Sequence, residues 1–187
     1  MQQKIKLRKK YLKIRQEKYF DINKKFFYPL FKLIRKKIKK KPFIIALYYP
    51  SNFELNVLKV LEFKYFSDQT ILLPVAEKNN LMRFYPWKKN EVLIVNKFGM
   101  LEPIRSKAKI PDVIIAPLLA FDKEKFRLGY GKGYYDRYLN KYIKKYKDII
   151  TVGVAFSFQK HNKLPINKND VKMNFIFTEK GIYKWIY

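Results

Sequence analysis

The sequence predicts one α/β domain in which helices cover both faces of a mostly parallel central sheet, giving three layers. Short apolar runs rich in β-branched residues indicate buried strands, and they span 43–48, 70–75, 111–117, 149–156 and 174–178. Segments with apolar residues three or four positions apart separate most of these runs, as in alternating strand and helix units. A chain of 187 residues is long enough for one substantial core, so residues 1–187 are expected to form a single domain.

Two amphipathic helices are expected before the first strand. Residues 2 to about 18 carry apolar side chains at near-helical spacing, with Lys and Arg between them. The second helix is predicted over about 22–40, with Pro29 near its first turns.

After the first strand, Ser51 or Asn52 is expected to cap a helix that runs to about Phe63. Glu54 would then lie in the first turn, where the helix dipole favours a carboxylate. Residues 81–86 predict a further strand with one partly exposed face, because apolar and polar side chains alternate there. Residues 98–103 are interpreted as a turn built on Gly99 and Pro103.

The stretch from Arg127 to Leu139 reads R-L-G-Y-G-K-G-Y-Y-D-R-Y-L and holds three of the six glycines at alternate positions. Glycine permits positive φ and close approach of the backbone to a ligand. A helix is predicted directly afterwards, with tyrosines on its buried face, and a helix N-terminus after such a loop suits an anion. The spacing matches neither G-x-x-x-x-G-K-[ST] nor G-x-G-x-x-G, so a tight turn that uses glycine for sterics alone is the alternative.

The composition is strongly basic: 42 Lys and Arg against 15 Asp and Glu give a net charge of +27. Such a charge favours a nucleic acid or another polyanion as partner, or else reflects a general bias toward lysine with solvated faces. Cysteine is absent and His161, interpreted as a surface residue, is the single histidine, which argues against a thiolate or histidine zinc site. No apolar run is long enough to cross a bilayer and no signal peptide is evident, so a soluble cytoplasmic protein is expected.

The glycine-rich stretch resembles the signature of the 5-formyltetrahydrofolate cyclo-ligase family, whose members are also called 5,10-methenyltetrahydrofolate synthetases. Further segments resemble the same family in the same order, namely Lys4–Arg8, Phe98–Pro103, Leu119–Asp122 and Val152–Gln159. The resemblance implies a Rossmann-like α/β/α fold. It also implies ATP-dependent conversion of 5-formyltetrahydrofolate to 5,10-methenyltetrahydrofolate, with Mg²⁺ as cofactor.

The resemblance also implies roles for individual residues. Residues implied to bind ATP are Lys4, Arg8, Arg127, Leu128, Gly129, Tyr130, Gly131, Lys132, Gly133, Tyr134 and Tyr135, of which Arg127 and Lys132 are the catalytic candidates. Residues implied to bind the folate are Tyr49, Glu54, Tyr130 and Tyr135, and the metal candidates are Asp136 and Asp170. The family usually has His before the second aspartate, whereas this chain has Asn169.

Two other functions stay open at the level of the sequence. A basic RNA-binding protein could use the glycine loop for backbone phosphate, but it would have no use for carboxylates such as Glu54 and Asp136 beside that site. A family member that binds ATP and folate without turnover is the other. For the enzyme we expect a monomer with ATP and 5-formyltetrahydrofolate, in its polyglutamylated form in cells, as substrates, and neither a membrane nor a specific nucleic acid as partner.

Overall fold

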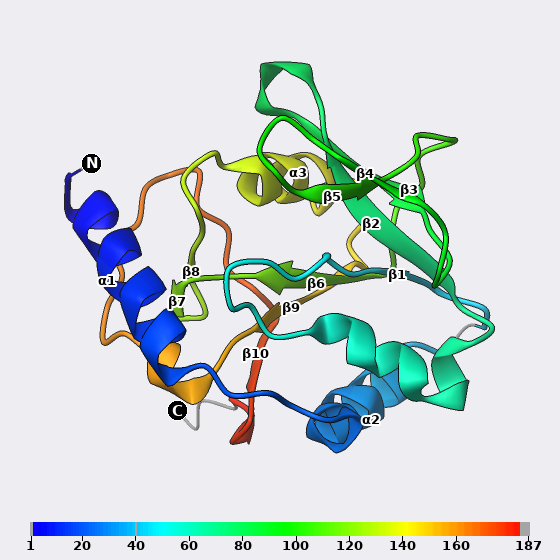
Figure 1. The fold of residues 1–187 in the computed structure, drawn as a ribbon, viewed down its shortest axis with the longest axis horizontal. Helices are drawn as coiled ribbons and strands as arrows, with labels where there is room; N and C mark the ends of the chain where they lie inside the picture. The colour runs from blue at the N-terminus through cyan, green and yellow to red at the C-terminus, as the bar shows by residue number, and fades with distance from the viewer. Residues whose placement is uncertain (1, 40, 184–187) are drawn as a thin grey trace.

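The computed structural model describes residues 2–39 and 41–183, and its centre is a seven-stranded sheet in the order β11-β10-β9-β6-β1-β2-β3 (Figure 1). The strands are β1 (Ile44–Ala46), β2 (Thr70–Ala76), β3 (Met82–Pro86), β6 (Val113–Pro117), β9 (Ile150–Val154), β10 (Phe175–Thr178) and β11 (Gly181–Ile182). Neighbours from β10 to β2 pair in parallel, while β3 and β11 pair antiparallel at the two edges. The predicted mostly parallel sheet is confirmed.

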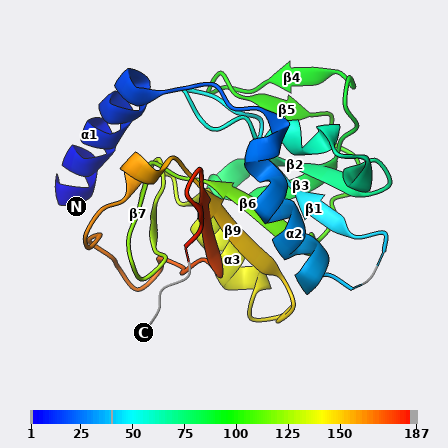
Figure 2. The ribbon, with the colours of Figure 1, turned by 90° about the horizontal axis from the view of Figure 1, so that it is seen from below.

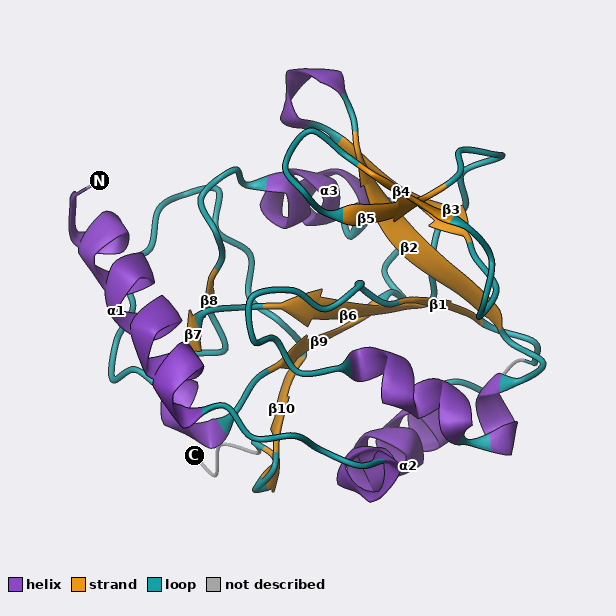
Figure 3. Cartoon of the chain, in the orientation of Figure 1, coloured by secondary structure: helices purple, strands orange, loops and turns teal. Residues whose placement is uncertain are grey.

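Each face of the sheet has its own apolar core, because side chains alternate along a strand. On β1, Ile45 packs with the buried side chains of α2 (Tyr28–Lys37) and of the 3₁₀ segment η2 (Val57–Glu62). Its neighbour Ala46 packs on the other face, with those of α3 (Tyr134–Tyr142). Figure 3 shows α2 and α3 on opposite sides of β6 and β9. The predicted three-layer arrangement is therefore present.

The first helix, α1 (Gln2–Lys18), stands beside the sheet and covers neither of these faces (Figure 2). It packs on a small hairpin of β7 (Ala120–Phe121) and β8 (Arg127–Leu128) through a third apolar cluster that includes Tyr11. The Tyr11 hydroxyl is 3.0 Å from Nδ1 of His161. His161 is thus half-buried against α1, and the prediction of a simple surface residue is wrong.

The region after β1 differs from the predicted helix over 51–63. Asn52 and Phe53 have φ values of 47° and 61°, which a right-handed helix excludes. A 3₁₀ turn starts only at Val57, where the Asn56 side chain accepts a hydrogen bond from Leu58 N at 3.2 Å. A second 3₁₀ turn, η3 (Lys64–Phe66), leads into β2. The prediction that Ser51 or Asn52 caps an α-helix is wrong.

The remaining differences from the sequence prediction are local. The second helix is split into η1 (Lys24–Phe27), which is capped by Asn23, and α2, which ends at Lys37; the predicted end at residue 40 lies outside the described residues. The segment 98–103 is more than a turn, because β5 (Leu101–Pro103) pairs with β4 (Leu93–Val95) around Gly99. Short 3₁₀ turns, η4 (Lys78–Asn80) and η5 (Ser157–Gln159), complete the fold. Across the described ranges, none of the helices has the length and apolar character that a membrane span requires.

Candidate functional site

The strand order reverses between β1 and β6, and this reversal positions the candidate site. From β1 the chain crosses to β2 on one side, whereas from β6 it crosses to β9 on the other. In open α/β sheets, ligands bind outside the carboxyl ends of the strands at such a switch point. Here the loop after β1 carries Glu54, and the hairpin and glycine loop follow β6. Both predicted binding segments therefore meet at one edge of the sheet.

The glycine loop, residues 129–133, has a backbone that favours glycine at two positions. Gly131 has φ of 109° and Gly133 has φ of 68°, both in the left-handed region. The Arg8 guanidinium lies against the loop: Nε donates to the Gly129 carbonyl at 2.9 Å, and a Cβ on Gly131 would lie 3.3 Å from Arg8 Cζ. Gly133 caps α3 without a side-chain acceptor, so the first N–H groups of α3 are available to an anion.

Cations converge on this loop from three elements. Lys4, on the same face of α1 as Arg8, forms an ion pair with Asp170. Arg127 of β8 is 3% exposed and its NH2 group lies 3.0 Å from Asp136 Oδ1. Lys132 is exposed within the loop itself. The structure therefore brings together the four predicted phosphate-binding cations, and two of them are paired with the predicted metal ligands.

The two candidate metal ligands lie in one neighbourhood. Asp136 Oδ1 accepts a hydrogen bond from the backbone of Val171 at 3.2 Å, and Val171 directly follows Asp170. The carbonyl of Asn169 accepts from the Asn140 side chain at 2.8 Å, which fixes this segment to α3. Within the described residues, no cluster of three or more Asp, Glu, His or Cys side chains forms a metal cage. Two carboxylates without a cage are the donor set that Mg²⁺ uses when it is bound together with phosphates.

Glu54 is buried at the end of the β1 loop, with 6% relative exposure. Its Oε1 accepts a hydrogen bond from the Tyr130 hydroxyl, and its Oε2 accepts from Ser51 N at 2.9 Å. Burial raises the pKa of Glu54, while the Tyr130 hydrogen bond and the charge of Arg15 act in the opposite direction. Burial, with the nearby charge of Glu54, also raises the pKa of Tyr135. The Tyr135 hydroxyl is buried and has no hydrogen-bond partner among the described residues.

Comparison with known proteins identifies the family to which this arrangement belongs. Residues 1–179 match the model of the 5-formyltetrahydrofolate cyclo-ligase family. The chain belongs to this family.

Similar proteins agree in sequence and in fold. The chain is 30% identical over 149 residues to 5-formyltetrahydrofolate cyclo-ligase of Escherichia coli K12, a match that covers 75% of this chain and 80% of that protein. The Haemophilus influenzae cyclo-ligase is 30% identical over 136 residues, covering 69% and 72%. The solved 5,10-methenyltetrahydrofolate synthetase of Aquifex aeolicus superposes with a TM-score of 0.72 at 31% identity, covering 96% of this chain and 91% of that one. The Mycoplasma pneumoniae synthetase gives 0.69 at 26% identity, covering 94% and 98%.

The resemblance predicted from ordered segments is thus confirmed, and the protein is an enzyme of the ligase class that acts in folate metabolism. Family membership also favours an enzyme over the alternative of an RNA-binding protein. The individual site residues of this cyclo-ligase, in contrast, rest on the geometry described above.

Tyr49 is predicted to bind folate, but it lies in a hollow that none of the other predicted folate residues lines. It lines a hollow of about 280 Å³ together with Leu58, Leu61, Trp87, Lys89, Asn90, Glu91 and Leu93. No hydrogen bond or ring contact between Tyr49 and Glu54 is present among the described residues. Its role in the folate site of this cyclo-ligase stays a prediction.

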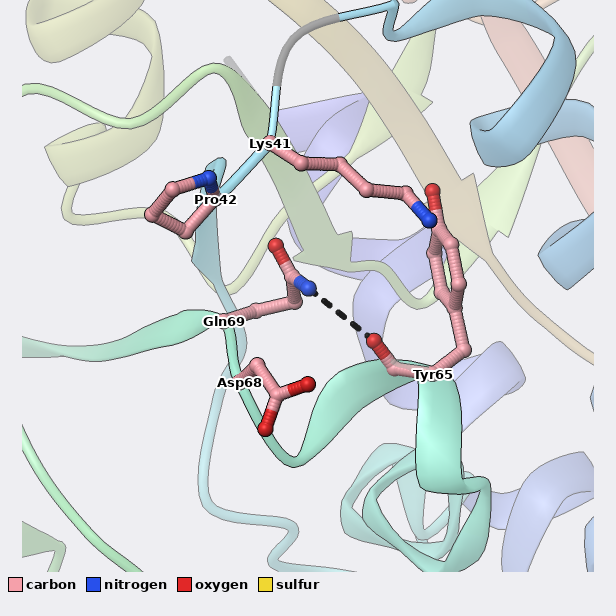
Figure 4. A pocket seen from close by; sticks show the side chains of 5 residues that line it. All are labelled: Lys41, Pro42, Tyr65, Asp68 and Gln69. Carbon is pink, nitrogen blue, oxygen red and sulfur yellow. Dashed lines mark hydrogen bonds between the residues drawn. The ribbon is translucent and has the colours of Figure 1, made fainter.

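A larger hollow of about 360 Å³ lies at the other end of the sheet (Figure 4). Its lining residues precede β1 and β2 in the chain, so they lie at the amino ends of these strands. Lys41 extends over the ring of Tyr65, and the Gln69 side chain donates to the Tyr65 carbonyl at 3.0 Å. This hollow is at the edge of the sheet opposite to the cyclo-ligase site and contributes no residue to it.

Two residues at the site were not found from the sequence. Arg15 is 1% exposed and donates a hydrogen bond to the Tyr130 hydroxyl. It lies seven residues after Arg8, so both are on one face of α1. Phe98, from the turn between β4 and β5, lies 6.5 Å from the ring of Tyr134, and the Lys132 ammonium is 5.7 Å from the Phe98 ring centre. The spacing on α1 shows that Arg15 shares a face with Arg8 but not that it is buried, and Phe98 begins a segment that resembles the family although no role was predicted for its side chain.

Proposed function

We propose that this cyclo-ligase converts 5-formyltetrahydrofolate to 5,10-methenyltetrahydrofolate with ATP and Mg²⁺, releasing ADP and phosphate. One observation carries the proposal. Tyr130 belongs to the glycine loop that Arg8 holds, and its hydroxyl reaches Glu54 in the loop after β1. A phosphate-binding loop and a buried carboxylate that can hold a pterin are therefore joined through a single residue.

The chemistry explains why both halves must be adjacent. The oxygen of the formyl amide is a very poor leaving group. Transfer of the γ-phosphoryl group of ATP to that oxygen gives an imidate-like phosphate and ADP. N10 of the folate then attacks the formyl carbon and gives up its proton to solvent, the carbon–oxygen bond breaks, and phosphate departs with its electron pair. The protein must hold the amide oxygen in line with the γ-phosphate and neutralise the charge around it.

The cations and amides of the site suit the phosphate half. In our proposal, Lys4 and Arg8 of α1 bind ATP phosphates together with the segment 127–135. Lys132 is exposed in the loop, so its ammonium can follow the transferring phosphoryl group. Arg127 adds positive charge and fixes the Asp136 carboxylate through their ion pair. The open N-terminus of α3 supplies further donors.

Asp136 and Asp170 are the residues that would hold Mg²⁺. Their described contacts reach Oδ1 of Asp136 and Oδ2 of Asp170, which leaves the second oxygen of each carboxylate for a metal. When bound, Mg²⁺ would neutralise charge on the phosphate oxygens.

Glu54 is proposed to bind the pterin end of the folate. A pterin presents adjacent N–H donors, and a carboxylate can accept two of them. Oε1 of Glu54 keeps a lone pair beyond its contact with Tyr130. Oε2 accepts from Ser51 N at 2.9 Å and from the Ser51 hydroxyl at 3.4 Å, and rotation of that hydroxyl would free its second lone pair for a ligand. The unpartnered hydroxyl of Tyr135 is a further polar group for the same ligand. We further propose that residues 1–187 act as one domain, monomeric and cytoplasmic.

The test is the absorbance of the methenyl product after mixing the protein, ATP, Mg²⁺ and 5-formyltetrahydrofolate. Product is expected only when ATP and Mg²⁺ are both present, and one ADP should form per product. Chelation of the metal should stop the reaction, and added Mg²⁺ should restore it. Product formation at an equal rate without ATP would refute the mechanism. Binding of both ligands without any product would show a family member that lacks turnover.

A further inference from the structure

Arg15 is a buried cation whose position the phosphate chemistry does not explain. It lies in the last turn of α1, and its guanidinium donates to the Leu118 carbonyl at 3.3 Å and to the Tyr130 hydroxyl at 2.7 Å. Within the part of the chain that the structure describes, Nε has no hydrogen-bond partner. Removing a cation from water is unfavourable unless a nearby negative charge compensates. The burial of Arg15 therefore requires a nearby anionic group.

That group is Glu54, which Arg15 reaches through one hydroxyl. A guanidinium can only donate, so the Tyr130 oxygen must accept from Arg15. Its single proton is then left to point at Glu54 Oε1, as the hydrogen bond between them requires. The chain Arg15–Tyr130–Glu54 consequently has one possible direction, and it ends on the oxygen proposed to bind a pterin.

We propose that Arg15 is a positioning residue for folate binding, which holds the Tyr130 hydroxyl against Glu54 and balances the charge of that buried carboxylate. This inference rests on the proposed role of Glu54 and names the partner on which that role depends. Arg15 itself touches no reacting atom.

The geometry of α1 separates Arg15 from the phosphate half of the site. Lys4 and Arg8 contact Asp170 and the glycine loop near the start of the helix. Arg15 lies seven residues beyond Arg8 on the same face, about 10 Å further along the helix axis. Its other partner, Leu118, directly follows β6. One helix face thus serves the nucleotide with its first half and the folate with its last turn.

The groups around Glu54 come from every element packed against it. They are Tyr48 after β1, Tyr130 of the glycine loop, Tyr135 of α3 and Arg15 of α1. Burial raises the pKa of all three tyrosines, so they stay neutral, and Arg15 supplies the positive charge that opposes the raised pKa of Glu54. Without Arg15 the pKa of Glu54 rises further, so a folate that needs the ionised carboxylate is lost at a higher pH.

The experiment is equilibrium titration of the whole chain with 5-formyltetrahydrofolate from about pH 5.5 to about pH 8, with ATP titrated separately. Arg15→Met should weaken folate binding about tenfold near neutral pH, while ATP affinity changes less than about twofold. The acid limb, which is the fall in folate affinity as the pH decreases, should move to a higher pH. Arg15→Lys keeps the charge, so the acid limb should stay where it is in the parent protein. Lys13→Met removes an exposed cation from the same helix and should change neither quantity.

A double-mutant cycle with Glu54→Gln separates this role from general damage to the fold. With no carboxylate to balance, Arg15→Met should cost less than about twofold in folate affinity. Equal losses with and without the Glu54→Gln substitution, or an unmoved acid limb, would overturn the inference while leaving the proposed reaction intact. Failure of the parent protein to bind folate would overturn the proposed function as well. If Arg15→Met does not fold, Arg15→Lys can be made in the parent protein and in the Glu54→Gln variant. Lysine loses the contact with Tyr130, and this loss should lower folate affinity only in the protein that retains Glu54.

Discussion

Replacing Glu54 by Gln is the sharpest test of the proposed folate half of the site. In the structure, Ser51 N and the Tyr130 hydroxyl both donate to Glu54, one to each oxygen. Neither donor can reverse, because Ser51 offers a backbone amide and the Tyr130 oxygen already accepts from Arg15. A glutamine has one acceptor oxygen, so whichever way it turns, its amide nitrogen faces a donor. The folded state should lose about 1–3 kcal/mol as a result.

The loss in folate affinity is a separate quantity. Two charge-assisted hydrogen bonds from a pterin would become at best one neutral bond, at a cost of about 1.5–3 kcal/mol. This corresponds to a dissociation constant about 10- to 150-fold higher. Nucleotide affinity should change little, because the contacts of Glu54 lie on the folate side of the glycine loop.

The assay combines calorimetric titration of each ligand with denaturant unfolding, at a temperature where the variant is fully folded. Glu62→Gln is a matched control, because Glu62 is exposed on η2 and undergoes the same chemical change. A variant with lower stability but unchanged folate affinity would show that Glu54 serves only to close its loop. Unchanged stability would refute the hydrogen-bond directions argued above.

Further predictions concern the phosphate half and the overall charge. Arg127→Met leaves Asp136 without its ion-pair partner and should lower the free energy of unfolding by roughly 3 kcal/mol, whereas Arg127→Lys should lower it less. A loss below about 1 kcal/mol in the Met variant would refute the ion pair as a stabilising contact. A protein of charge +27 should capture a folate with a longer polyglutamate tail more effectively, so kcat/KM should be higher for the triglutamate than for the monoglutamate. That advantage should shrink as salt rises to about 0.5 M, with little change in kcat, since screening then acts within a few ångströms. A ratio near one at low salt would show that the excess charge reflects composition alone.

The layers of this fold could be predicted because each strand carries its own signal. The run Pro111–Pro117 is apolar and β-branched, and the structure places Val113–Pro117 between two parallel neighbours, where both faces are covered. Helices α1 and α3 likewise lie where their periodicity indicates. These features are local, so a single sequence suffices to find them.

The segment after β1 could not be predicted, because its conformation depends on a distant partner. Ser51 and Asn52 look like helix caps, but the Ser51 amide is taken by Glu54, whose other oxygen bonds to Tyr130, 76 positions away. Asn52 adopts positive φ as a consequence of that closed turn and cannot begin a helix. Cap rules weigh only neighbours in the chain, so they select the wrong polar residue here and miss Asn56.

The candidate site likewise combines residues that the sequence pointed to with residues that depend on distant contacts. The family resemblance pointed to Lys4, Arg8 and Glu54, and the structure brings α1, the glycine loop and the loop after β1 together at one edge of the sheet. Arg15 escaped notice because one arginine among 42 basic residues gives no sign of burial. Phe98 escaped notice because its approach to Tyr134 depends on how the hairpin of β4 and β5 folds over. Tertiary contacts of this kind have no local signature.

The placement of α1 has a consequence for the time at which the enzyme can be made. Lys4 finds its partner 166 positions later, and Arg8 finds the Gly129 carbonyl 121 positions later. At about 5–20 residues per second, a ribosome needs on the order of 10–30 s between synthesising Lys4 and synthesising Asp170. Until the hairpin of β7 and β8 has been synthesised, the first helix to emerge lacks the apolar cluster on which it packs, although β1, β2 and β3 can already pair. The contacts that hold α1 against the glycine loop and Asp170 therefore form only after residues 129 and 170 have been synthesised, so the proposed nucleotide site is completed later than the pairing of β1, β2 and β3.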